Sequence, residues 1–94
     1  MKWELDELVR MSDLQSKQQF PSYVVAQQYE TTIGGESAIV QVFTMEVTGI
    51  PLKGAVATLL KGKTVYMITL GVTEDQYEQY RDEFILVTNT FKFD

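Results

Sequence analysis

The spacing of apolar residues changes along the chain from a helical period to an alternating one and back again. In the first stretch they recur at three- and four-residue steps, as on one helix face. These residues are Leu5, Leu8 and Val9, with Met11 and Leu14 near the edge of the face. We predict a helix over residues 4–19, which ends at Phe20-Pro21 because the residue before a proline avoids helical angles.

The middle of the chain is rich in β-branched and aromatic residues and divides into four strand-like runs. The predicted strands cover residues 23–33, 37–48, 52–60 and 64–72. Their connections are Gly34-Gly35, residues 48–51 and residues 61–63. Connections this short join antiparallel neighbours, so the pattern predicts a four-stranded meander.

The second run indicates a central strand, because both of its faces are apolar where it begins. One face carries Ile39, Gln41 and Phe43, and the other carries Ala38, Val40 and Val42. Gly54 and Gly71 interrupt the third and fourth runs, which indicates a β-bulge or the close approach of a helix.

A second helix is predicted after the last strand and runs to about Asn89. Thr73 and Gln76 have the spacing of a capping box, in which Thr73 accepts the N3 amide and Gln76 reaches back. An aromatic stripe at helical spacing follows, formed by Tyr77, Tyr80, Phe84, Val87 and Phe91. Residues 90–93 are expected to extend back over the sheet. The whole chain, residues 1–94, is therefore predicted to be one α+β domain of order α-β-β-β-β-α, with the sheet flanked by an N-terminal and a C-terminal helix.

Composition narrows the classes of partner. The chain is 45% apolar and 22% charged, an ordinary globular mixture that can form one modest core. Its net charge of −5 argues against nucleic acid and against anionic lipid surfaces as partners. No run approaches the ~20 apolar residues that span a bilayer, so direct membrane insertion is not expected.

Missing residue types remove most enzyme chemistry. The sequence contains no cysteine and no histidine, so it has no thiolate and lacks the commonest general base and transition-metal ligand. No serine lies in a Gly-x-Ser-x-Gly elbow, and Gly34-Gly35 is too short for a phosphate loop. We expect no catalytic residues, no cofactor and no metal, and interpret the chain as not being an enzyme. Catalysis by Asp, Glu and Tyr alone is the least favoured reading, because such sites usually occupy larger clefts.

Two features of the last helix have both a functional and a structural interpretation. Glu78 and Asp82, one turn apart, suit a calcium or magnesium site, but a solvated helix face is favoured because no loop of oxygen ligands is present. The aromatic stripe can line an apolar ligand pocket against the sheet, although a stripe of this kind more often forms the core. The candidate pocket residues are Tyr66, Tyr77, Tyr80 and Phe84.

Several segments together resemble the C-terminal half of PsbP-like domains, the group that includes the photosystem II extrinsic subunit and the DcrB-type bacterial lipoproteins. The resemblance lies in Phe20-Pro21-Ser22-Tyr23-Val24-Val25, Ile50-Pro51-Leu52-Lys53-Gly54, Lys61-Gly62-Lys63, residues 64–69, Tyr77-x-x-Tyr80-x-x-x-Phe84 and Asn89-Thr90-Phe91-Lys92-Phe93. These motifs cover most of the chain, and all are structural. Family members usually begin with an aromatic-rich Tyr-Pro…Trp segment that this sequence lacks, so it is either truncated on its N-terminal side or a minimal version of the fold.

The resemblance implies a non-enzymatic accessory or binding module, often in proteins that are anchored or secreted outside the cytoplasm; the residues themselves leave the compartment undefined. The leading functional hypothesis is a non-catalytic interaction module that docks onto a protein partner, whose identity is unknown, or supports a larger envelope-associated assembly. The alternative is a carrier of small apolar ligands with a pocket between the C-terminal helix and the sheet. Because four strands and two helices leave part of the sheet uncovered, we also expect self-association, with a homodimer as the simplest form.

Overall fold

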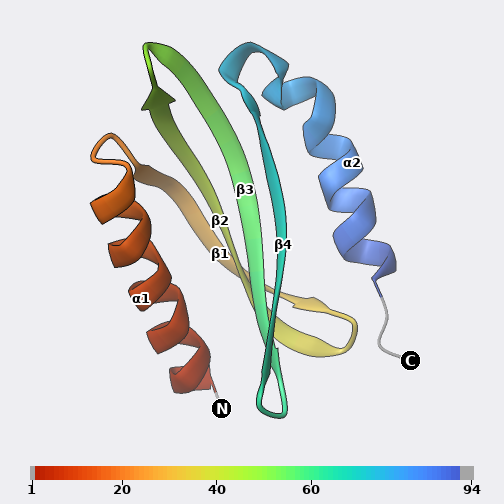
Figure 1. Ribbon diagram of the computed structural model, residues 1–94. Helices are drawn as coiled ribbons and strands as arrows, with labels where there is room; N and C mark the ends of the chain where they lie inside the picture. The colour runs from red at the N-terminus through yellow and green to blue at the C-terminus, as the bar shows by residue number, and fades with distance from the viewer. Residues whose placement is uncertain (1, 92–94) are drawn as a thin grey trace.

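The computed structural model describes residues 2–91 (Figure 1). Its elements are α1 (Lys2–Gln19), β1 (Val24–Ile33), β2 (Glu36–Val47), β3 (Ile50–Lys61), β4 (Thr64–Thr73), the short 3-10 helix η1 (Glu74–Gln76) and α2 (Tyr77–Thr90). The predicted α+β class and the order α-β-β-β-β-α are confirmed. Residues 90–93 were expected to extend over the sheet, but Thr90 is the last residue of α2. Phe91 packs against the core, and residues 92 and 93 lie outside the described residues.

The four strands form one antiparallel sheet in the order β1-β2-β3-β4, which is the predicted meander. Each hairpin closes through two residues, since Ile33 pairs with Glu36 and Val47 pairs with Ile50. Gly34 and Gly35 have φ values of 60° and 84°, so the first turn uses the left-handed region, as the sequence predicts. The second turn is shorter than predicted, because β3 already begins at Ile50.

The helices cover opposite faces of the sheet (Figure 1). On one face, Leu5 and Val9 of α1 pack with Ile39 of β2. On the other, Phe84 of α2 packs on a larger cluster formed by Ile33, Ala38, Val40, Ala55, Ala57 and Leu59. The start of β2 is buried on both sides, as predicted for a central strand.

Two local predictions were wrong in detail. The bulge lies between Val25 and Gln27 of β1, whereas Gly54 and Gly71 face each other in regular register. The second helix starts with the 3-10 turn, where the Thr73 hydroxyl donates to Gln76 Oε1 at 2.9 Å and makes no cap hydrogen bond to the backbone. A side-chain pair therefore replaces the predicted capping box.

Candidate functional site

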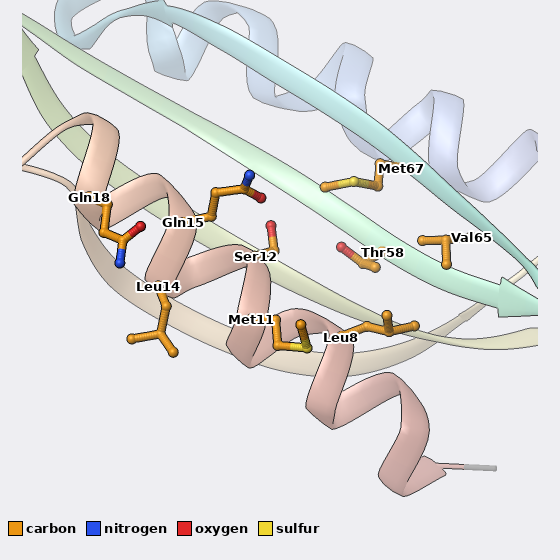
Figure 2. Close-up of a pocket in the computed structure, with 9 residues that line it drawn as sticks. All are labelled: Leu8, Met11, Ser12, Leu14, Gln15, Gln18, Thr58, Val65 and Met67. Carbon is orange, nitrogen blue, oxygen red and sulfur yellow. The ribbon is translucent and has the colours of Figure 1, made fainter.

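A groove lies between α1 and β4. It has a volume of about 610 Å³ and is open to solvent. Figure 2 shows its lining, which comes from α1, β3 and β4 and consists of Leu8, Met11, Ser12, Leu14, Gln15, Gln18, Thr58, Val65 and Met67. Met11 is 59% exposed and Met67 is 52% exposed, so both sides of the groove present apolar atoms to water.

The groove exists because α1 covers only part of its face of the sheet. Leu5 and Val9, one turn apart, hold the helix over β2 and β3. The next strand, β4, turns Val65 and Met67 toward the same face, since these residues pair with Leu60 and Thr58 of β3. With no helix above them, these two side chains stay exposed and form the far wall.

The groove lining contains no charged and no acid–base group. Its polar members are two hydroxyl and two amide side chains: Ser12, Thr58, Gln15 and Gln18. Such a surface can desolvate an apolar partner and offer a few neutral hydrogen bonds, but it carries no group that could transfer a proton near neutral pH.

The opposite side of α1 is fixed by a buried polar network. Gln41 of β2 is 2% exposed, and its Nε2 donates to Asp13 Oδ2 at 2.8 Å and to Gln28 Oε1 at 2.9 Å. The second oxygen of Asp13, Oδ1, is buried and has no hydrogen-bond partner. Asp13 and the groove residues lie on different sides of one helix, so the network holds α1 toward β1 and away from β4.

The same carboxylate affects Tyr23, whose ring stacks on Phe43 with centroids 5.3 Å apart. Burial raises the pKa of the Tyr23 hydroxyl, Asp13 raises it further, and a hydrogen bond with Ser16 opposes the shift. The folded state therefore favours the neutral phenol. The associated stability is fully present below the pKa of an unfolded tyrosine, about 10, and is lost as the pH rises through the higher folded value.

Replacing Tyr23 with phenylalanine should therefore reduce the loss of stability in alkali. Urea unfolding at a series of values from about pH 8 to about pH 11 measures this, and the variant should show a shallower decline than the parent above about pH 10. An unchanged decline would contradict the assignment. Tyr77→Phe gives a second test on the other face, because burial also raises the pKa of Tyr77.

The candidate pocket of the sequence analysis lies under α2 and is only partly assembled from the expected residues. Tyr77 and Phe84 line a cavity of about 270 Å³ against β1, β2 and β3. Tyr66 and Tyr80 are not among its lining residues, and Tyr66 instead packs near Phe91 at a centroid distance of 6.5 Å. The remaining lining residues are Gln27, Tyr29, Val40, Val42, Ala55, Arg81 and Ile85.

Two cationic side chains, Arg81 and Lys53, contact carboxylates and an aromatic ring of α2. Arg81 lies between the two carboxylates considered as a cation site, 3.0 Å from Glu78 Oε2 and 3.9 Å from Asp82 Oδ1. Lys53 of β3 lies over the Tyr77 ring, with Nζ 4.6 Å from the centroid. Val87, which was predicted in the buried stripe, is half exposed. Within residues 4–91, no three metal-ligating side chains gather at one point.

The groove could have been anticipated only in part. Leu8, Met11, Gln15 and Gln18 are spaced as one side of a helix, and Val65 and Met67 alternate on one face of a strand. Neither pattern specifies which strand the helix lies over.

No helix of the described residues is both long and apolar enough to cross a membrane.

Comparison with solved structures identifies one clear fold relative. It is PA94 from Pseudomonas aeruginosa, a protein of unknown function described as a candidate regulator, with a TM-score of 0.81 and 16% sequence identity. The match covers 95% of this chain and 61% of that one, so this chain spans less than two thirds of its structural relative. No family model matches the sequence, and no curated protein does. At this identity the similarity establishes a shared fold and nothing more.

Proposed function

We propose that this chain is a non-catalytic interaction module that binds an uncharged, apolar segment of a partner protein in the groove between α1 and β4. The observation that carries the proposal is the pair of half-exposed methionines, Met11 and Met67, on facing walls of that groove. Methionine is flexible and polarizable, and it is frequent on surfaces that accept varied apolar partners.

The rim of the groove supports a polypeptide as the bound partner. Gln15 and Gln18 line it beside the apolar walls, and their amides can both donate to and accept from a peptide backbone. The absence of charge in the lining favours an uncharged segment, because a buried charge would have no partner there. This arrangement offers the apolar centre and polar edge that are usual in protein interfaces.

The cavity under α2 is the weaker candidate. Its volume of about 270 Å³ falls below the usual range of ligand pockets, roughly 300–1,000 Å³, whereas the groove falls inside it. The charged Arg81 at that cavity also suits an apolar ligand less well. The PsbP-like assignment, and with it a role in an assembly outside the cytoplasm, remains an expectation that is compatible with an accessory module.

Met67→Lys should weaken binding through the groove. The test measures fluorescence polarization with a panel of labelled peptides of equal length, some apolar and uncharged and others with acidic residues inserted. The parent should bind the uncharged peptides, and Met67→Lys should weaken that binding by roughly tenfold or more, because it brings a charge into the apolar wall.

Leu86→Lys is the matched control, since Leu86 is also an exposed apolar side chain but lies on α2, away from the groove. It should leave peptide binding unchanged. Equal losses in both variants would argue against the groove as the site, and equal binding of acidic and uncharged peptides would argue against an apolar partner.

A further inference from the structure

β4 is an edge strand of the sheet (Figure 1). Its ten residues contain no charged side chain and no proline, and it pairs with β3 without a register shift. Edge strands are usually protected by charges, prolines or bulges. The opposite edge, β1, has a bulge between Val25 and Gln27 and a charged residue at Glu30. β4 is thus the edge that is open to a further strand.

The β3–β4 register determines which backbone groups point away from the sheet. Lys61 and Thr64 flank a two-residue turn and pair with each other, so they form a hydrogen-bonded pair at the end of the ladder. Such pairs alternate along an antiparallel ladder. The even-numbered residues of β4 therefore direct their N–H and C=O groups toward β3, and the odd-numbered residues direct theirs outward.

We propose that β4 pairs antiparallel with β4 of a second copy of this chain, with Thr69 of both copies on the two-fold axis. In this register Met67 lies opposite Gly71 of the second copy, and Val65 lies opposite Thr73. All of these residues have odd numbers, so outward-pointing groups meet outward-pointing groups throughout. The contact is the same surface on both copies, as a closed two-fold dimer requires.

Side chains along the edge fit this register. A Cβ added at Gly71 would meet no atom within 4 Å, which leaves room for Met67 from the second copy. The net charge of −5 repels two copies, but β4 itself adds no charge to the contact. Each four-stranded sheet would then continue into the other as one sheet of eight strands, with the two grooves side by side on one face. The inference does not depend on the proposed function of the groove.

Charged substitutions of Thr69, which lies on the two-fold axis, test the pairing. Light scattering over a dilution series should give the parent twice the 10.8 kDa mass of one chain. Thr69→Lys and Thr69→Glu should each raise the dissociation constant by roughly tenfold or more, because each puts like charges directly opposite one another. An equimolar mixture of the two variants should recover the dimer. Circular dichroism establishes that each variant is folded, as expected for an exposed position.

Thr32 supplies the matched control, because it is also an exposed threonine on an edge strand, but that strand is β1, at the opposite edge of the sheet. Thr32→Lys should leave the dimer intact. Since the chain has no cysteine, the Thr69→Cys variant can form a disulfide only between position 69 of the two copies. It should cross-link faster than the Thr32→Cys variant. A parent that is monomeric at every concentration overturns the proposal. So does a dimer that survives both charges at Thr69, or equal cross-linking at the two positions.

Discussion

Replacing Gly54 with alanine is expected to lower the free energy of unfolding by about 2–3 kcal/mol, because the added methyl group has no space. A Cβ at Gly54 would lie 2.1 Å from the carbonyl oxygen of Leu70 and 2.7 Å from Cζ of Phe43. The first contact is with backbone of the neighbouring strand, which cannot turn aside as a side chain does. Accommodating the methyl group must therefore shift β4 or displace the Phe43 ring, which stacks on Tyr23.

Gly71→Ala is the matched control, since Gly71 pairs with Gly54 in register and has open space where its Cβ would be. It should change the free energy of unfolding by no more than about 1 kcal/mol, because alanine costs less backbone entropy than glycine in a strand. Thermal unfolding of both variants measures the difference. For a domain of this size, Gly54→Ala should lower the Tm by about 10–20 °C. Equal shifts would show that glycine at position 54 has no steric role.

The two glycines differ in a way that depends on tertiary contacts and not on the local sequence. Gly54 and Gly71 are equally unusual inside strand patterns, and from the sequence both indicated a bulge or the close approach of a helix, whereas the atoms close to Gly54 belong to the strand residues Phe43 and Leu70. Only the sheet register shows that Phe43 covers one of them and leaves the other open. Strands, turns and helices were predictable because each depends on local spacing and on turn residues such as Gly34-Gly35, whose positive φ values the structure confirms.

The candidate site was less predictable, because it depends on how elements lie on one another. The aromatic stripe of α2 was predicted, and Tyr77 and Phe84 do face the sheet. The groove was not predicted, since nothing local in α1 specifies that it packs over β2 and β3 and stops short of β4. That position depends on contacts between distant parts of the chain, namely the packing of Leu5 and Val9 on Ile39 and the hydrogen bond between Asp13 and Gln41, 28 residues apart.

Gln41→Leu is the second change with a large expected effect, a loss of about 2–3 kcal/mol in the free energy of unfolding. Leucine has a similar size, so the loss reflects hydrogen bonding more than packing. Gln41 Nε2 is the donor to Asp13 Oδ2, and the other oxygen of Asp13 is already buried without a partner. Removing the amide takes the donor away from Oδ2 of a half-buried carboxylate whose Oδ1 already has no partner, and leaving one member of such a pair without the other is strongly destabilising.

Adding Asp13→Leu to Gln41→Leu should recover most of that loss, because replacing both partners by apolar groups removes the unsatisfied charge. The double variant is expected within about 1 kcal/mol of the parent, so the two effects are strongly non-additive. Urea unfolding of the parent, the two single variants and the double variant measures this coupling, and simple additivity would contradict the network. Gln28→Ala, at an exposed position that accepts from the same amide, should cost little. Because the network holds α1 away from β4, Gln41→Leu should also weaken peptide binding in the groove, an effect that a purely local loss of stability would not produce.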